Sequence, residues 1–326
     1  MSRVIGLAIL LEAVRCIDRG TEDLFKAHNE LGSSDYELSL DGPFADMSWE
    51  KFKSKILMDP QDCSATMGRI SVTGFKEPLP GQVDWRDQGV VSGVKNQGHC
   101  GSCWTFSTTG ALEAHHAIKY KNWRTSELSE QQLLDCGNDF DNHACSGGLP
   151  SHAFEYIKYA GGLSKEFFYP YRAEGTGDNS KCQFDASSDK GKIGAMTIRS
   201  FNITEGDEES LERIVATVGP VSVAFQVVDD FRLYKRGIYS TEKCQAGPKD
   251  VNHAVLIVGY GTEPDVGRPY WIVKNSWGND WGEDGYFKIA RGRNMCGIAT
   301  CASYPILATT TSDFIDETAT LDVQTV

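Results

Sequence analysis

The sequence predicts an α+β fold of two lobes, a helical lobe and a β-barrel-like lobe, with a cleft between them. Two observations support this prediction. Capped segments of helical period occur in the first half, at 129–134 and 149–159. Short β-rich runs separated by glycines occupy the second half, at 221–225, 254–258 and 270–274. A helical lobe packed against a sheet-rich lobe leaves a cleft, which is where a substrate would lie.

Composition and charge exclude several classes of function. A chain of 326 residues with 40% hydrophobic positions can bury a large core. Its net charge of −13 argues against partners such as nucleic acid or an anionic membrane. Ten cysteines are too many for a reducing cytosol unless they bind metal, and their spacing does not form metal-binding clusters. We therefore expect disulfides, an oxidising compartment and no metal or cofactor. The sequon at Asn202 fits a secretory route.

The N-terminal region, residues 1–78, is predicted to be a pro-segment. Residues 4–11 are apolar and about as long as a signal-peptide core, so 1–20 is a candidate signal peptide. A helix of the pro-segment or a misread gene start are the alternatives, and the run is too short to span a bilayer.

The rest of this region is expected to contain two helices around an extended stretch at 36–40. In the second helix, Ser48 can act as the N-cap, with Phe52 and Ile56 on one face. Standing alone, this part would be a small helical subdomain. Residues 59–76 show no sustained period and are predicted to be a linker suited to proteolysis.

The segment from Gln97 to Trp104 indicates a nucleophile. Two glycines and small polar residues lead into a helix whose first turn contains Cys103. The free N–H groups of a helix N-terminus favour a thiolate, so we expect Cys103 to ionise more easily than a surface cysteine. Cys100 and Cys103 could instead form a redox pair, but Ser102 and Trp104 are typical of a peptidase nucleophile.

A cysteine nucleophile needs a base, a residue that orients the base, and donors for the oxyanion. His253, at the start of an apolar strand, would form an ion pair with Cys103. The side-chain oxygen of Asn275 would hold the imidazole, and Trp277 would shield that bond from water. Gln97 would donate to the oxyanion beside the main-chain N–H of Cys103.

These motifs resemble those of the papain-like cysteine peptidases, from about residue 79 to 305. Within that family the chain is most similar to cathepsin H and the plant aleurains. The segments that carry this second likeness are 103–113, 147–151, 245–250, 251–255 and 294–299. The resemblance implies a papain-like peptidase domain at 79–307. The remaining tail, 308–326, is acidic and rich in threonine, and is predicted to be disordered.

Residues 59–66 resemble the cathepsin H mini-chain. The resemblance implies that this octapeptide is cut from the pro-segment, kept by a disulfide and laid in the cleft, with the carboxylate of Thr66 facing the free amine of the substrate. A peptide that fills one side of the cleft excludes internal segments of a polypeptide, and a carboxylate there pairs with an α-ammonium group. The alternative is that 59–66 is ordinary pro-segment, discarded on activation.

Further assignments follow from the same resemblance. It implies the disulfides Cys63–Cys301, Cys100–Cys145, Cys136–Cys182 and Cys244–Cys296, which leave Cys103 free and Cys16 unpaired. It also implies that Leu149, Pro150 and Ala254 line the main specificity pocket, although apolar residues at these positions could simply be packed.

The sequence therefore predicts a cysteine peptidase made as a zymogen, with aminopeptidase preference and some endopeptidase activity. An open-cleft endopeptidase without the mini-chain and a non-catalytic papain-fold binding protein are the alternatives. The expected partners are peptide and protein substrates and cystatin-type inhibitors. We expect a monomer that passes through the secretory pathway to a lysosome or vacuole, or is released outside the cell.

Overall fold

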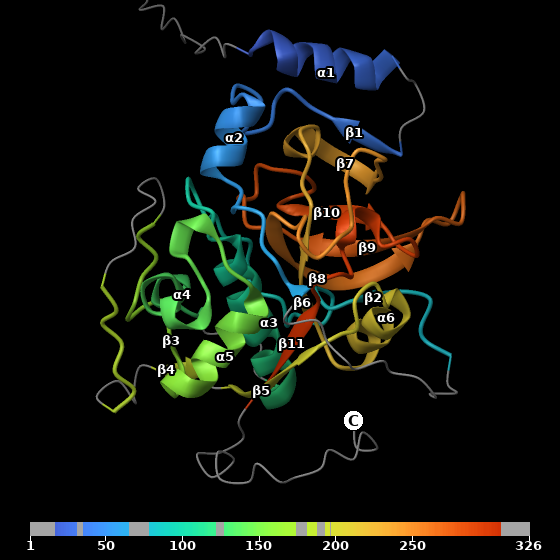
Figure 1. Ribbon diagram of the computed structural model, residues 1–326. Helices are drawn as coiled ribbons and strands as arrows, with labels where there is room; N and C mark the ends of the chain where they lie inside the picture. Colours follow the sequence, from blue (N-terminus) through green and yellow to red (C-terminus); the bar gives the residue numbers. More distant parts are fainter. Residues whose placement is uncertain are drawn as a thin grey trace, which may run out of the picture.

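The computed structural model describes residues 17–30, 35–64, 78–121, 127–173, 181–187, 193–195 and 197–307. Most of the candidate signal peptide, Cys16, the linker beyond residue 64, Thr66 and the tail 308–326 lie outside these residues. Figure 1 shows helices α3, α4 and α5 on one side of the molecule and the larger strands on the other. The α+β fold of two lobes is thus confirmed.

Three helices form the helical lobe: α3 (Cys103–Tyr120), α4 (Glu130–Cys136) and α5 (Pro150–Ala160). Ser129 caps α4 by accepting a hydrogen bond from the N–H of Gln132 at 3.0 Å. Helix α5 has Pro150 at its start and Gly161, in the left-handed conformation, at its end. Short 3-10 helices lie at Asn138–Phe140, Ala144–Ser146, Phe231–Leu233 and Met295–Gly297.

One nine-stranded sheet dominates the other lobe, in the order β1-β7-β10-β9-β8-β6-β11-β5, with β2 paired to β8. Its strands are β1 (Tyr36–Leu38), β2 (Val83–Asp84), β5 (Thr197–Asn202), β6 (Val221–Phe225), β7 (Tyr234–Tyr239), β8 (His253–Thr262), β9 (Pro269–Lys274), β10 (Tyr286–Ala290) and β11 (Ser303–Leu307). Only the β7/β10 pair is parallel. Strands β3 (Leu163–Ser164) and β4 (Ile193–Ala195) form a separate pair.

The expected barrel does not close within the described residues. The two ends of the sheet, β1 and β5, do not pair with each other. Closure requires every edge to meet another, and here β1 comes from the N-terminal region and pairs only with β7. The lobe is therefore an open, strongly hydrogen-bonded sheet. Helix α6 (Glu208–Thr217) packs against β6 and β8.

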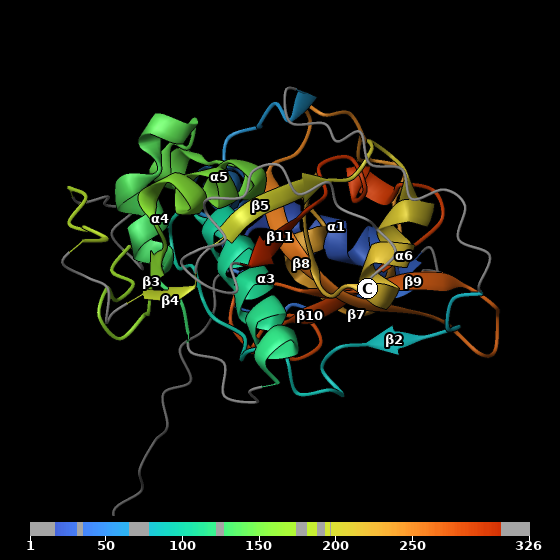
Figure 2. The same ribbon diagram turned by 90° about the horizontal axis from the view of Figure 1, so that it is seen from below.

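Helix α3 joins the two lobes, and Figure 2 shows it beside β8 and β11. The hydroxyl of Ser107 donates to the carbonyl of Val255 at 2.7 Å, and that of Ser222 donates to the carbonyl of Ser107 at 2.9 Å. A Cβ at Gly110 would lie 3.1 Å from Leu256, so the glycine permits the close approach of helix and strand. These contacts hold the start of α3 beside the start of β8.

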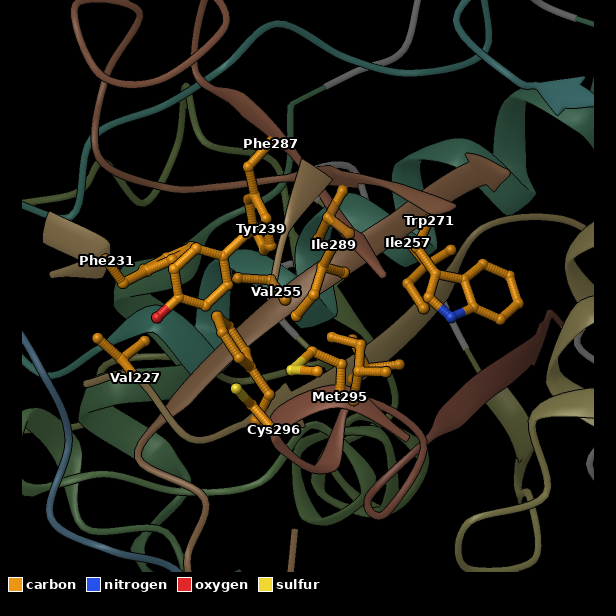
Figure 3. Close-up of a cluster of buried hydrophobic side chains, with 14 of the residues drawn as sticks. Val227, Phe231, Tyr239, Val255, Ile257, Trp271, Phe287, Ile289, Met295 and Cys296 are labelled. Atoms are coloured by element: carbon orange, nitrogen blue, oxygen red, sulfur yellow. The ribbon is translucent and has the colours of Figure 1, made fainter. Parts of the chain in front are cut away.

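The sheet lobe has an aromatic core. Phe231 is fully buried, and its ring lies 4.8 Å from that of Tyr239, 4.9 Å from that of Phe287 and 5.3 Å from that of Phe225. Figure 3 shows part of this cluster, with Phe231, Tyr239 and Phe287 close together. A second cluster includes Trp104, Leu133 and Phe154 of the helical lobe. This second cluster also includes residues of β6, β8 and β9, and α3 contributes Trp104 and Leu112 to it, so it spans the junction of the two lobes.

Residues 17–30 and 35–58, which we call the N-terminal segment, pack mainly on the sheet lobe. Figure 1 shows this blue part of the chain running over one end of the molecule and then descending from α2 between helices and strands. It contains α1 (Arg19–Glu30), β1 and α2 (Trp49–Lys55), and Ser48 caps α2 as predicted. Phe52 and Ile56 are buried, and the Phe52 ring lies 5.3 Å from that of Trp277.

Four disulfides are present: Cys63–Cys301, Cys100–Cys145, Cys136–Cys182 and Cys244–Cys296. They are the four pairs that the resemblance implies. Cys103 has a free thiol. Among the described residues, no helix is both long enough and apolar enough to cross a bilayer.

Candidate active site

Cys103 is the first residue of α3 and is completely buried. Its sulfur accepts a hydrogen bond from the main-chain N–H of Ala254 at 3.3 Å, across the junction of the two lobes. The N–H groups of Ala254, Trp104 and Cys103 itself all act to lower the pKa of the thiol. The fold therefore brings a thiol to a helix N-terminus, where a thiolate is favoured.

His253 begins strand β8, next to Ala254, and its side chain is buried. Its Nε2 lies 2.8 Å from Oδ1 of Asn275, the residue that follows β9. The ring of Trp277 stacks on the imidazole with centroids 4.6 Å apart and an angle of 27°. This arrangement leaves Nδ1 of His253 without a hydrogen-bond partner in the described part of the protein.

Gln97 has its side-chain amide fixed in one orientation. The hydroxyl of Ser276 donates to Oε1 at 2.7 Å, while the main-chain N–H of Gln97 donates to the carbonyl of Ser276 at 2.9 Å. The amide nitrogen of Gln97 then points the other way and donates to the carbonyls of Ile56 and Cys100, at 2.7 and 2.8 Å. A fixed amide N–H agrees with the predicted role as an oxyanion donor, which stays a prediction.

The N-terminal segment covers this site. The carbonyl of Ile56 accepts from the amide of Gln97, and the N–H of Met58 donates to the carbonyl of Asn252, beside His253, at 3.2 Å. A Cβ at Gly101 would lie 2.8 Å from the carbonyl oxygen of Leu57. The segment thus occupies the amide of Gln97, the predicted oxyanion donor, so the structure is that of a closed form.

Burial reverses the expected ionisation. It raises the pKa of the Cys103 thiol to about 12, against the opposing main-chain N–H groups, and it lowers the pKa of His253 to about 4. The prediction that Cys103 ionises easily is therefore wrong for this closed form, in which Nδ1 of His253 makes no hydrogen bond to the thiol. The ion pair with His253 stays a prediction. Desolvation disfavours both charges, and it outweighs the helix N-terminus.

The residues expected to form the specificity pocket do not all share one cavity. Leu149 and Pro150 line a small cavity together with Cys63 and Cys301. Ala254 lines a different cavity. Leu149 and Ala254 nevertheless belong to the same apolar cluster. A common pocket for the three residues stays a prediction.

Asn202 lies at the end of β5, opposite Ser303 of β11, and is half-buried. Its Oδ1 is buried without a hydrogen-bond partner in the described residues, and the side chain lines the same cavity as Leu149. Glycosylation at this sequon stays a prediction. A strand position is an unusual setting for a modification that needs an accessible amide nitrogen.

The first residues of the octapeptide come directly after the part of the chain that covers the site, and they bond to the peptidase domain. Asp59 donates its N–H to the carbonyl of Ser146 at 2.9 Å, and Gln61 donates to Val251 at 2.9 Å and forms a β-bridge with it. Cys63 donates to Pro248 at 3.0 Å and is disulfide-bonded to Cys301. Thr66 lies outside the described residues.

Two further contributors to the site, Ser276 and Ile56, are not apparent as functional residues in the sequence. Ser276 directly follows Asn275, and its position in the motif was the available signal for a role beside Gln97. The carbonyl of Ile56 had no such signal, because a main-chain oxygen can come from any residue. The separation of 41 residues between Ile56 and Gln97 hides the contact from local patterns.

Comparison with known proteins agrees with this geometry. Residues 79–306 match the family described as papain family cysteine protease. The chain is 54% identical to pro-cathepsin H of Medicago truncatula over 81% of this chain and 72% of that protein, and 52% identical to the aleurain-like thiol protease of Arabidopsis thaliana over 88% and 76%. It also resembles the solved structure of digestive procathepsin L2 from the Tenebrio molitor larval midgut, with a TM-score of 0.79 and 40% identity over 89% of this chain and 90% of that one.

The match covers more than half of the chain, and the relatives are similar along most of their length. A free thiol at a helix start, beside a buried histidine and asparagine, is the arrangement expected of a cysteine peptidase. This chain belongs to the papain family of cysteine proteases and is a cysteine peptidase in a pro-form related to pro-cathepsin H and aleurain.

Proposed function

We propose that this protein is the zymogen of an aminopeptidase with some endopeptidase activity, in which residues 59–66 stay attached as a mini-chain. The observation that carries the proposal is the disulfide from Cys63 to Cys301, which ties this segment to the body. The main-chain bonds of Asp59, Gln61 and Cys63 support it, because they lay the segment along the body on leaving the covered site.

The proposed chemistry uses the residues assembled around α3. Once the N-terminal segment has left, the thiolate of Cys103 attacks the carbonyl of the scissile bond, and the oxyanion is held by the amide of Gln97 and the N–H of Cys103. His253, oriented by Asn275 and shielded by Trp277, protonates the leaving amine. It then activates the water that hydrolyses the acyl-enzyme.

In this proposal the octapeptide sets the specificity. It occupies one side of the cleft and thereby excludes chain on that side of the scissile bond, and the carboxylate of Thr66 pairs with the α-ammonium group of the substrate. Leu149, Pro150 and Ala254 supply the apolar specificity pocket. The peptidase domain comprises 79–307, and the pro-segment lies within 1–78.

The setting is proposed from the same features. Four disulfides and the sequon at Asn202 support a route through the secretory pathway to a lysosome or vacuole, or out of the cell. Substrates are peptides and proteins. We further propose that the mature enzyme is a monomer and is inhibited by cystatin-type proteins.

The test compares one amino-acid amide that has a free α-amine with its N-acetylated form, using the matured enzyme at mildly acidic pH. We expect a strong preference for the free amine, and loss of that preference in the Cys63→Ser/Cys301→Ser double variant. The Cys136→Ser/Cys182→Ser double variant is the matched control, because it removes a disulfide that does not hold the octapeptide. Equal rates on the two substrates would support the open-cleft endopeptidase instead.

A further inference from the structure

The hydroxyl of Tyr171 connects the two segments that flank the thiol. It donates to the main-chain carbonyl of Gln97 at 2.8 Å and lies 2.8 Å from Oγ of Ser102. A carbonyl can only accept and a phenol has one proton, so the Ser102 hydroxyl is the donor to the tyrosine oxygen. One oxygen atom thus joins the residue that carries the oxyanion donor to the residue that precedes Cys103.

Tyr171 is held in place by contacts that do not involve its hydroxyl. Its main-chain N–H donates to Oε1 of Glu166 at 2.7 Å. Its ring meets that of Phe106, on the first turn of α3, edge to face with centroids 5.0 Å apart. Because the ring is fixed by packing, removal of the hydroxyl alone should leave the ring where it is.

The Ser102 hydroxyl, which lies 2.8 Å from the Tyr171 oxygen and 3.5 Å from the carbonyl of Cys100, does not cap α3. Ser102 is the N-cap residue, and a serine there usually accepts from an N–H of the first turn. Here its side chain makes no capping bond, and the N–H of Thr105 donates to the main-chain carbonyl of Ser102 instead. The N–H of Trp104 is therefore left for the sulfur of Cys103, whose pKa it lowers.

We propose that Tyr171 is a positioning residue for catalysis: its hydroxyl fixes Gln97 on one side of the oxyanion position and keeps the Ser102 hydroxyl away from the first-turn N–H groups on the other. This inference rests on the proposed roles of Cys103 and Gln97. Tyr171 itself does not touch the reacting atoms.

The first experiment uses Tyr171→Phe in the full chain, matured in the same way as the wild type. Active sites are counted with an irreversible thiol-directed epoxide. We expect kcat per active site to fall about tenfold with KM within about twofold, since a change of 1.4 kcal/mol in transition-state stabilisation gives a factor of about ten. The matched control is Tyr156→Phe, which removes a buried hydroxyl that accepts from Gln132 at 2.9 Å, away from the thiol.

The control separates positioning from stability. Both variants lose one hydroxyl from the helical lobe, and we expect both to lower the melting temperature. Only Tyr171→Phe should lower kcat. An unchanged kcat in Tyr171→Phe, or an equal loss in Tyr156→Phe, would overturn the proposal.

The second experiment measures the pH dependence of Cys103 alkylation by iodoacetamide in the matured enzyme. We expect Tyr171→Phe to shift the thiol pKa upward, because the released Ser102 hydroxyl then competes for the N–H of Trp104. Adding Ser102→Ala should reverse this shift without restoring kcat, since the carbonyl of Gln97 still lacks its donor. Alanine is compatible with this position in the nucleophile signature. A thiol pKa that stays raised in the double variant would overturn the part of the proposal that concerns Ser102.

The proposed function is tested separately by Cys103→Ala, which should abolish hydrolysis. Hydrolysis that persists in Cys103→Ala contradicts the proposed function. A wild-type enzyme that depends on Cys103 but is indifferent to Tyr171→Phe contradicts only the role of Tyr171.

Discussion

Acid is expected to open the covered site, and His253 should supply a large part of the effect. Burial lowers the pKa of His253 to about 4 from an ordinary value of 6.5. When the N-terminal segment leaves, the imidazole regains water and binds a proton more readily. The neutral imidazole therefore contributes fully to the stability of the closed form, relative to the open form, above pH 6.5. This contribution is lost as the pH falls from 6.5 towards 4.

The size of this effect follows from the two pKa values. Between pH 7 and pH 5, protonation of one such histidine shifts the equilibrium towards the open form by about 20-fold, or about 2 kcal/mol. The thiol would also titrate, so the measurement belongs in a Cys103→Ser chain, which cannot process itself. In that chain, His253 is the member of the Cys103–His253 pair that still titrates.

Hydrogen exchange measures the opening directly. We expect the protection of residues 49–58, after correction for intrinsic exchange chemistry, to fall about 20-fold from pH 7 to pH 5. The fall should disappear when His253→Gln is added to Cys103→Ser. His115→Gln is the matched control, because burial also lowers the pKa of His115 to about 4 but its imidazole binds the carbonyl of Pro220 away from the segment.

The reasoning would be refuted by an equal loss of protection with and without His253. That result would assign the effect of acid to other groups. In the His115→Gln chain, the protection of residues 49–58 should still fall between pH 7 and pH 5. The free energy of unfolding of that chain should depend less on pH.

Three further results are expected. Glu113→Gln should lower the free energy of unfolding by about 3 kcal/mol in urea, because it leaves the ammonium of Lys95 with one carboxylate fewer in a buried cluster; a loss below about 1 kcal/mol would contradict this. Gly101→Ala should prevent formation of the Cys100–Cys145 disulfide, as mass spectrometry of the secreted chain can show, because the added methyl group overlaps the carbonyl of Cys145. Tyr36→Phe should speed maturation about fivefold in a gel time course, since it removes one hydrogen bond of about 1 kcal/mol from the N-terminal segment to Asp230; an unchanged rate would show that this contact does not limit release.

Local features of the fold were predictable from the sequence. The caps at Ser48 and Ser129 act within one helical turn, and Pro150 and Gly161 mark the ends of α5 by their own backbone preferences. The strands at 221–225 and 270–274 were visible because buried strands are rich in β-branched and aromatic residues.

Features that depend on distant contacts were not predictable in this way. Strand β1 pairs with β7, about two hundred residues later in the chain, and this pairing leaves the sheet open rather than closed. The pKa of Cys103 could be expected to fall from its helix position alone. It rises because the thiol is completely buried in the folded chain, and no local pattern reports that burial.

The Cys63–Cys301 disulfide gives the two halves of the N-terminal region different behaviour on dilution. After chain cleavage, the N-terminal segment is held only by non-covalent contacts, so its occupancy of the site depends on its concentration. In the proposed mature enzyme, the disulfide keeps residues 59–64 beside the site at a fixed local concentration however dilute the solution is. The reductants that keep a catalytic thiol active act on this bond as well. Storage and assay buffers therefore decide whether the cleaved octapeptide stays attached to the isolated protein.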